Sequence, residues 1–361
     1  MDYLPALDGL RAVAILLVLW HHGPPLMRVP AGFFSSTFGR MSASGWMGVD
    51  LFFVLSGFLI TGILLRSRGA PRQLRRFWIR RALRIFPVAI VYLGLVYFTA
   101  RAFGWPPLLA HFNRWTPFIF YFGNIDIALH GWVDSAVAIL WSLAIEEHFY
   151  AVWPLVSKLL SPRRLGALCV AIAIAGPLVR WLTWPRMGQI AVYVSTWCRI
   201  DNLAIGGALA VAFHETALRE RTIRVCRWLA IPSLAWLVYV PAEPFGMLYP
   251  AHNPEWFAVF GYSAIAIAFA VLVALAADPS PAPRPVLNNP VMRYLGRISY
   301  GIYLWHILAG YVVQDLIGAR LEPPLKIIIW LFAAIGFASI SWFAFERPIL
   351  GLKKRFPISS P

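Results

Sequence analysis

Charge is scarce in this chain. Asp, Glu, Lys and Arg together make up 13% of its 361 residues, whereas 60% of the residues are hydrophobic. Soluble globular domains carry about 25% charged residues, so this composition excludes an ordinary soluble protein. Several apolar runs approach the length of about 20 residues that a helix needs to cross the hydrocarbon core of a bilayer. The composition therefore predicts an integral membrane protein.

Cysteine is nearly absent as well. Cys169, Cys198 and Cys226 fall on different apolar or loop segments and show no recurrent spacing. Disulfide frameworks and Cys/His zinc sites both depend on such spacing, so neither is expected here. We expect no bound metal ion.

The apolar runs predict an all-α fold, a polytopic membrane helix bundle of about ten transmembrane helices, in a single domain covering residues 1–361. The predicted spans lie near 7–23, 47–65, 83–101, 136–158, 165–183, 193–213, 228–241, 256–277, 296–316 and 325–346. The run 228–241 is short for a span. We expect the segment 115–130 to be an interfacial or re-entrant piece and not an eleventh span.

Acidic residues are the rarer charge: 16 Asp and Glu stand against 32 Lys and Arg. Most of the basic residues fall in one set of alternate loops, and eight arginines lie in residues 66–84. Positive residues mark the cytoplasmic side, so both termini are expected on the cytoplasmic side of the membrane. The first span lacks the features of a cleaved signal peptide. Basic and aromatic residues do not alternate as in RNA-binding surfaces, so no nucleic-acid partner is expected.

Arg11 and His22 lie eleven residues apart in the run LDGLRAVAILLVLWHHG. Eleven residues turn an α-helix by about 1100°, about 20° past three full turns, so both side chains share one stripe about 16 Å apart. His21 falls about 80° off that stripe. An imidazole suits proton abstraction from an alcohol near neutral pH, or acceptance of an acyl group. The alternative is a solvated histidine at the membrane interface.

Asp50 lies near the outer end of the next span, in GWMGVDLFFVLSGFLI, at a depth similar to that of His22. A carboxylate there could orient the imidazole and stabilise its cation. The alternative is an acidic residue at a helix start, where the macrodipole favours it. Ser56 and Gly57 in the same run are expected to permit close helix packing.

Arg80, Arg81 and Arg84 open the third predicted span in RRALRIFP. Arg81 and Arg84 are three residues apart and share a helix face. Paired guanidinium groups suit phosphates, which a nucleotide-type cosubstrate would carry. The alternative is a basic anchor that contacts anionic lipid head groups.

Ser142, Glu146 and Tyr150 repeat every four residues in WSLAIEEHFYAVWP and form one polar stripe on the fourth predicted span. Glu146 and Glu147 are too costly to expose to lipid, so they are expected to face a cavity or a partner. The expected salt-bridge partners are Arg11 and Arg199.

Three further polar groups fall in or beside later spans. Arg199 and Asp201 are expected to pair locally as an ion pair. His306 shares a helix face with Ser299 and Tyr303 and is expected to be a buried, hydrogen-bonded histidine.

Taken together, these segments resemble the acyltransferase-3 family of integral membrane O-acyltransferases over nearly the whole chain. The resemblance rests on seven motifs in the family's order: LDGLRAVAILLVLWHH, GWMGVDLFFVLSGFLI, RRALRIFP, WSLAIEEHFYAVWPL, RIDNLAIGGALA, ISYGIYLWH and FERP. The family's pattern of an arginine, ten residues and a histidine falls on Arg11 and His22. His148 stands where many relatives carry glutamine.

The resemblance implies transfer of an acyl group, expected to be acetyl, from cytosolic acyl-coenzyme A to a hydroxyl of a glycan or glycosylated metabolite. Acetyl-coenzyme A would be a cosubstrate, with no permanently bound cofactor. The family's RxxR motif falls on Arg81 and Arg84, which would contact coenzyme A phosphates. The expected catalytic residues are His22, Arg11, Asp50 and Glu146. The expected substrate-binding residues are Trp141, Ser142, Tyr150, Arg199 and Asp201.

Two further expectations concern an additional domain and an alternative function. Many relatives carry a C-terminal hydrolase-like domain outside the membrane, and we expect a stand-alone member without one. The alternative function is a transporter or flippase for a lipid-linked sugar, since intramembrane charges and a polar cavity would occur there too. Turnover of acyl-coenzyme A distinguishes the two.

Overall fold

The computed structural model describes residues 4–30, 32, 36–105, 111–133, 136–242, 253–280, 284–318 and 320–357, and all regular structure in these ranges is helical. The α-helices are α1 (Pro5–Leu26), α2 (Thr37–Ala43), α3 (Met47–Arg66), α4 (Gln73–Phe103), α5 (Trp115–Ile119), α6 (Gly123–His130), α7 (Leu140–Leu159), α8 (Pro162–Val194), α9 (Thr196–Ala212), α10 (Thr216–Ala242), α11 (Tyr262–Ala276), α12 (Pro285–Asn288), α13 (Pro290–Arg297), α14 (Ser299–Ile317), α15 (Pro323–Ser341) and α16 (Arg347–Gly351). Short 3-10 or π turns are η2 (Ser44–Trp46), η4 (Phe112–Arg114), η5 (Ala136–Ile139), η7 (Phe257–Gly261), η8 (Trp342–Glu346) and η9 (Leu352–Arg355).

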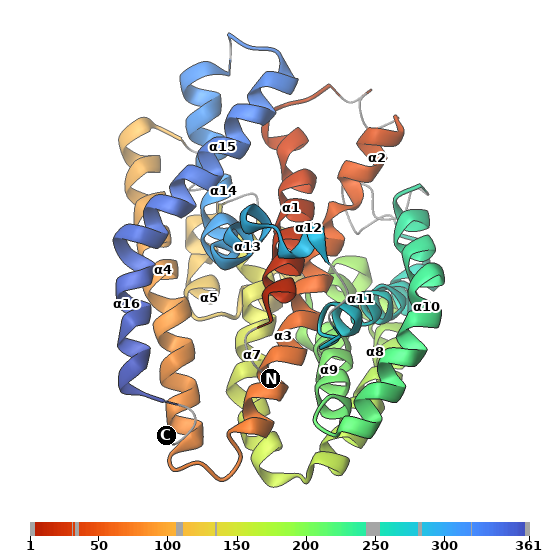
Figure 1. Cartoon of the computed structure of the whole chain (residues 1–361). Helices are drawn as coiled ribbons and strands as arrows, with labels where there is room; N and C mark the ends of the chain where they lie inside the picture. The colour runs from red at the N-terminus through yellow and green to blue at the C-terminus, as the bar shows by residue number, and fades with distance from the viewer. Residues whose placement is uncertain are drawn as a thin grey trace.

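The predicted all-α membrane bundle is confirmed (Figure 1). Each of the ten predicted spans corresponds to a long helix: α1, α3, α4, α7, α8, α9, α10, α11, α14 and α15. Within the described ranges, six helical stretches are long and apolar enough to cross a membrane by composition alone, and they include α3, α4, α8, α10, α11 and α15. The four other helices, α1, α7, α9 and α14, are shorter or more polar and carry most of the residues singled out above.

Two spans begin earlier than predicted, and the segment 115–130 forms no span, as expected. Helix α10 covers 27 residues, about 40 Å, so the short span 228–241 was wrong because the helix also includes the arginine-rich stretch before it. Helix α4 begins at Gln73 and therefore carries part of the 66–84 arginine run as helix. Residues 115–130 form α5 and α6, of 5 and 8 residues, too short to cross a bilayer.

The outer helices present apolar side chains outward. Ile174 on α8 is 72% exposed, Ile231 on α10 is 79% exposed and Phe332 on α15 is 73% exposed. A soluble protein rarely exposes such a continuous apolar surface, whereas a bilayer requires one. The chain is therefore an integral membrane protein.

One end of the bundle carries the connections from α3 to α4, from α7 to α8 and from α9 to α10, at the bottom of Figure 1. Basic residues gather there, among them Arg66, Arg68, Arg72, Arg163 and Arg219. We call this the basic end, and the other the opposite end. Helix α1 runs away from the basic end, antiparallel to α3, so Arg11 lies nearer to the basic end than His22 does.

Helices α3 and α9 pack backbone against backbone through glycine. A Cβ atom added at Gly57 would lie 1.9 Å from the carbonyl oxygen of Leu203, and one added at Gly206 would lie 2.1 Å from that of Val54. Small residues permit such close approach between membrane helices. The contact brings the polar side chains of α3 and α9 within bonding distance of each other.

Gly57→Ala is expected to lower the free energy of unfolding by about 1–3 kcal/mol, because the added methyl group overlaps the backbone of α9. The measurement is the thermal unfolding midpoint of purified protein in detergent. Gly94→Ala on α4 is the control, since nothing lies within 4 Å of its added Cβ. Equal midpoints for the two variants would contradict the packing described here.

Candidate active site

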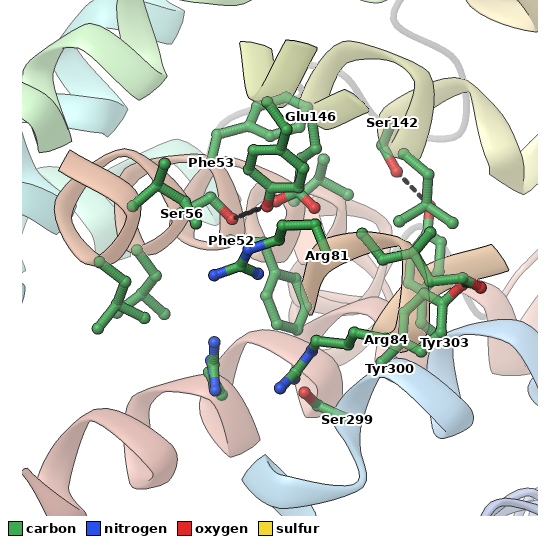
Figure 2. A pocket seen from close by; sticks show the side chains of 18 residues that line it. Phe52, Phe53, Ser56, Arg81, Arg84, Ser142, Glu146, Ser299, Tyr300 and Tyr303 are labelled. Atoms are coloured by element: carbon green, nitrogen blue, oxygen red, sulfur yellow. Dashed lines mark hydrogen bonds between the residues drawn. The ribbon is translucent and has the colours of Figure 1, made fainter. Parts of the chain in front are cut away.

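A polar cavity of about 80 Å³ lies among α1, α3, α4, α7 and α14 (Figure 2). A single water needs about 10–15 Å³, so the space admits several groups of that size. Its polar lining residues are Arg11, Ser56, Arg81, Arg84, Ser142, Glu146, Tyr150, Ser299, Tyr300 and Tyr303. We call it the central cavity.

The polar stripe of α7 faces this cavity. Ser142, Glu146 and Tyr150 all lie on its wall. Ser56 of α3 donates a hydrogen bond to Oε1 of Glu146, and its Oγ lies 3.0 Å from the hydroxyl of Tyr150. The carboxyl of Glu146 therefore bonds to a hydroxyl, and α3 is tied to α7 at this level.

A second hydroxyl pair lines the same wall. The hydroxyl of Tyr303 donates to the carbonyl of Ile139 at 2.7 Å, and it lies 2.6 Å from Oγ of Ser142. Because the single phenolic proton is used on Ile139, Ser142 is the donor between the two hydroxyls. Figure 2 shows this bond joining α7 to α14 at one side of the cavity.

Arginines supply the charge of the central cavity. Figure 2 shows Arg81 and Arg84 of α4 extending into it. The guanidinium carbon of Arg81 lies 5.1 Å from the ring centroid of Tyr150. Arg11 pairs with Asp8 one turn earlier in α1, with 3.5 Å between Nη1 and Oδ1.

A larger cavity of about 370 Å³ adjoins the central one on the side of the basic end. We call it the vestibule. The two cavities share Arg11, Leu59, Arg81 and Arg84, and the vestibule adds Arg66, Arg80 and Lys353. Asp8 is the one acidic residue among the described residues that line it. This excess of positive charge suits a ligand with several negative charges.

The C-terminal segment closes one side of the vestibule. Arg80 donates to the carbonyl oxygens of Lys353 and Phe356, each at 3.1 Å. These bonds hold η9 against the start of α4, which places Lys353 beside the arginines. Neither Lys353 nor Arg66 was among the predicted site residues.

His22 lies beyond the central cavity, toward the opposite end. Its Nδ1 donates to the carbonyl of Val18 at 2.9 Å. The ring of His306 lies between it and the cavity wall: its centroid is 4.9 Å from that of His22 and 6.0 Å from that of Tyr303. Neither histidine lines the central cavity. His306 is fully buried and bonded to the carbonyl of Tyr303 at 2.8 Å, as its position in the sequence predicted.

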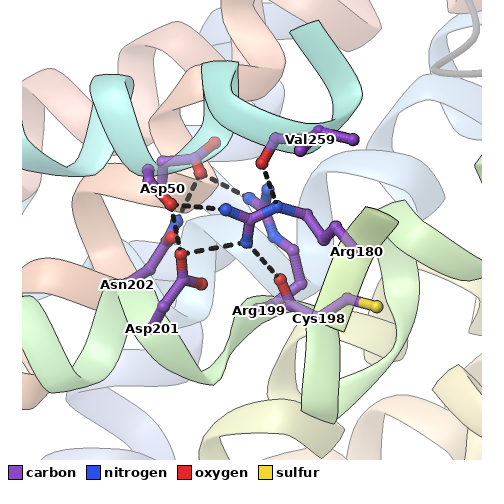
Figure 3. Close-up of polar contacts among 8 residues, drawn as sticks. Asp50, Arg180, Cys198, Arg199, Asp201, Asn202 and Val259 are labelled. Atoms are coloured by element: carbon purple, nitrogen blue, oxygen red, sulfur yellow. Dashed lines mark hydrogen bonds and ion pairs between the residues drawn. The ribbon is translucent and has the colours of Figure 1, made fainter. Parts of the chain in front are cut away.

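Asp50 does not orient His22 in this structure. It accepts hydrogen bonds from Arg199, with which it forms an ion pair, and from Nδ2 of Asn202 at 2.6 Å (Figure 3). The expected contact with His22 was wrong because Asp50 points from α3 toward α9. Both charged groups of the pair are fully buried.

Asp201 pairs with Arg180, and the expected Arg199–Asp201 pair is wrong. Nη1 of Arg180 lies 2.9 Å from Oδ2 of Asp201, which also accepts from Ser263 at 2.6 Å (Figure 3). Arg199 instead lies over the ring of Tyr262, 4.2 Å from its centroid. It is therefore not a partner of Glu146 as expected, and neither Arg199 nor Asp201 lines the central cavity.

Trp141 does not line the central cavity, although Ser142 beside it does. Its ring packs on Tyr193 with centroids 4.8 Å apart, and on Phe53 at 6.4 Å. Trp141 thus belongs to an aromatic cluster between α3, α7 and α8.

Sequence reasoning missed the roles of two residues. Arg180 lies within a predicted span, and an arginine at that depth needs a partner, which is a signal that could have found it. Ser56 was expected only to permit close packing, yet it bonds to Glu146. A hydroxyl in an apolar helix commonly bonds to a neighbouring helix, but sequence alone does not say which one.

Arg199→Leu is expected to destabilise the fold by about 3–5 kcal/mol, because it leaves the carboxylate of Asp50 buried without its cation. Thermal unfolding in detergent measures the loss. The double variant Asp50→Leu with Arg199→Leu is expected to recover part of it, since both buried charges are removed.

Arg227→Leu is the matched control for this pair. Arg227 lies 2.9 Å from Asp278 but is 61% exposed, and exposed pairs contribute little. A double variant no more stable than Arg199→Leu, or a loss of equal size in Arg227→Leu, would show that the buried pair is not what stabilises this region.

Comparison with known proteins identifies relatives along most of the chain. The profile of a family described as an acyltransferase domain matches residues 4–345. A Bacillus subtilis protein provisionally named a peptidoglycan O-acetyltransferase is 31% identical over 383 residues, which cover 96% of this chain and 55% of that protein. No solved structure matches.

Two further relatives are similar at the same coverage. The peptidoglycan O-acetyltransferase of Listeria monocytogenes is 28% identical over 365 residues, covering 96% of this chain and 56% of that protein. A Staphylococcus aureus protein provisionally named an O-acetyltransferase is 28% identical over 366 residues, covering 96% of this chain and 57% of that protein. The chain thus spans just over half the length of these curated relatives.

Proposed function

The chain belongs to the acyltransferase-3 family, and from that premise we propose that it transfers an acyl group, acetyl in the first instance, from acyl-coenzyme A to a hydroxyl group of a glycan or glycosylated metabolite. Relatives named for peptidoglycan O-acetylation support a carbohydrate acceptor. The observation that carries the proposal is the connection of the vestibule to the central cavity through Arg11, Arg81 and Arg84.

The vestibule suits the nucleotide end of coenzyme A. Arg66, Arg80, Arg81, Arg84 and Lys353 surround a space of about 370 Å³, and guanidinium groups bind phosphates through charge-assisted, often bidentate hydrogen bonds. In our proposal the basic end faces the cytoplasm of the bacterial inner membrane, where acyl-coenzyme A is made. The positive-inside rule supports this orientation, in which both termini lie on the cytoplasmic side.

The central cavity suits the linear arm of the donor. Its volume of about 80 Å³ is small, and its lining includes both the arginines shared with the vestibule and Ser142 and Tyr303. We propose that the arm extends along it and brings the thioester toward His22. Tyr303 lines the cavity, and the ring of His306 lies against both Tyr303 and His22, so these two residues mark the end of the cavity that is nearest to His22.

His22 is the proposed general base. Its Nδ1 proton is committed to the carbonyl of Val18, which leaves Nε2 unprotonated and able to accept a proton. In the reaction, Nε2 takes the proton of the acceptor hydroxyl, the oxygen attacks the thioester carbonyl, the carbon–sulfur bond breaks, and the proton passes to the leaving thiolate. An acyl-histidine intermediate on the same nitrogen would give the same products.

Arg11 acts on the donor in this proposal and not on the reacting carbonyl. It lies on the same helix as His22 but about 16 Å away along the axis. A guanidinium that far from the base cannot contact the same tetrahedral intermediate. Arg11 lines both cavities, so it can bind the donor at the junction between the phosphates and the linear arm. Glu146, which accepts a hydrogen bond from Ser56, is proposed to orient the arginine side chains that line the central cavity.

The direct test uses the whole chain purified into lipid nanodiscs, with acetyl-coenzyme A and a soluble peptidoglycan fragment. Release of free thiol together with an acetyl mass increase on the glycan is the expected result. A transporter or flippase for a lipid-linked sugar would release no thiol and would leave the glycan mass unchanged.

Arg81→Ala with Arg84→Ala is expected to raise the KM for acetyl-coenzyme A by about 10- to 100-fold, the size of one or two lost charge-assisted hydrogen bonds. The KM for the acceptor should change little. Arg101→Ala is the control, because Arg101 is exposed at the far end of α4. A donor KM that is unchanged in the folded double variant would assign these arginines to lipid anchoring.

His22→Ala is expected to lower kcat by about 10²- to 10⁴-fold, the usual contribution of a general base. His21→Ala should retain substantial activity, since Nδ1 of His21 bonds to the carbonyl of Ala43 at 2.7 Å and ties α1 to α2. The comparison needs equal amounts of folded protein in the membrane. An equal loss of kcat in both variants would refute the assignment of His22, and not His21, as the base that shares a helix face with Arg11.

A further inference from the structure

His306 is a buried imidazole to which the reaction described above gives no role. It is fully buried in α14, and its Nδ1 lies 2.8 Å from the carbonyl oxygen of Tyr303. A carbonyl only accepts, so Nδ1 carries the proton and Nε2 carries the lone pair. Nε2 is itself buried and bonds to nothing among the described residues. An unpartnered acceptor inside a protein is costly and calls for a physical explanation.

The free nitrogen of His306 belongs to a ring that lies against His22. The two ring centroids are 4.9 Å apart, with the ring planes inclined by 52°. His22 has the same tautomer, because its own Nδ1 donates to the carbonyl of Val18. In both residues, therefore, Nδ1 is anchored to the backbone and Nε2 is left for chemistry.

The surroundings hold His306 in place and offer His22 few other polar partners. Nε1 of Trp330 on α15 donates to the backbone carbonyl of His306 at 2.8 Å. Among the described residues, His21 is the other titratable side chain whose ring contacts His22, at 5.0 Å between centroids, and Nδ1 of His21 already bonds to the carbonyl of Ala43. Among the described residues, His306 is the one neighbouring ring of His22 that combines full burial with an unpartnered acceptor.

We propose that His306 is a positioning residue for His22. This inference rests on the proposed function. Nε2 of His22 first takes the proton of the acceptor hydroxyl. Once the acceptor oxygen has attacked the thioester carbon and moved away, the new N–H donates a hydrogen bond to Nε2 of His306. The bond holds the imidazolium in place until the proton passes to the leaving thiolate. No proton is lost or gained by His306 over the cycle.

A neutral imidazole suits this position better than a carboxylate does. In many histidine bases a carboxylate stabilises the cation, but Asp50, the carboxylate expected in that role from the sequence, accepts hydrogen bonds from Arg199 and Asn202. A second buried carboxylate at this depth would itself need a permanent cation. An imidazole acceptor carries no charge while His22 is neutral, so it costs less to bury in the resting enzyme.

The kinetic test compares His306→Phe with His306→Gln in the whole chain in nanodiscs. Phenylalanine fills the space without an acceptor, whereas glutamine places an amide near the position of Nε2. His306→Phe is expected to lose about 10- to 100-fold in kcat, the size of a hydrogen bond to a charged group, with the donor KM unchanged. His306→Gln should recover most of that loss.

A second measurement does not depend on turnover. Diethyl pyrocarbonate modifies neutral imidazole, and fragment mass spectrometry assigns the modification to His22 at each pH. A hydrogen-bond acceptor beside His22 favours the protonated form of its imidazole. His306→Phe removes that acceptor, so the pH at which His22 is half modified should fall by about one unit. His306→Gln and His21→Phe should stay close to wild type.

The two measurements separate the possible failures. A drop in kcat for His306→Phe without a shift of the His22 profile, or a glutamine variant that behaves like phenylalanine in both assays, overturns the pairing and leaves His306 a packing residue. If the wild-type protein transfers no acyl group, the proposed function fails. The His22 profile in the same variants then still decides whether His306 is its hydrogen-bond acceptor.

Discussion

The cost of an unpaired charge inside a membrane is the constraint on which this structure depends. Two arginines and two aspartates are fully buried between α3, α8, α9 and α11, and each arginine pairs with one aspartate. Because Asp50 pairs with Arg199 and Asp201 with Arg180, α9 is bonded to α3 on one face and to α8 on the other. These bonds and the glycine contacts between α3 and α9 fix the rotation of the central helices about their axes.

Charge balance also distinguishes scaffold from site. In the Asp50–Arg199 and Asp201–Arg180 groups, every guanidinium has its carboxylate. Among the described residues that line the vestibule, six side chains are basic and one, Asp8, is acidic. Such an excess is stable only where water or an anionic ligand can reach it. The same rule that demands pairing in the scaffold therefore indicates a site for phosphates at the basic end.

The proposed chemistry is divided along the length of α1. Arg11 lies where the vestibule meets the central cavity, and His22 lies beyond the far wall of that cavity. One helix thus carries a group for the donor's charged part and a group for proton transfer, about 16 Å apart. Between Arg11 and His22, the Ser142–Tyr303 hydrogen bond joins α7 to α14, and His306 lies against Tyr303. The donor's arm would pass beside these residues.

Sequence by itself determined what depends on local order. Composition and run length identified a membrane bundle and its ten long helices, and the four-residue spacing of Ser142, Glu146 and Tyr150 placed them together on one wall. Tertiary structure alone decided which groups meet across the bundle. Ser56 bonds to Glu146 from 90 residues away, Asp50 pairs with Arg199 and not with His22, and His306 lies against His22. The physical reason is that helical periodicity is a property of neighbouring residues, whereas partners between helices depend on how each helix is rotated and packed, and close glycine contacts and buried ion pairs set that rotation.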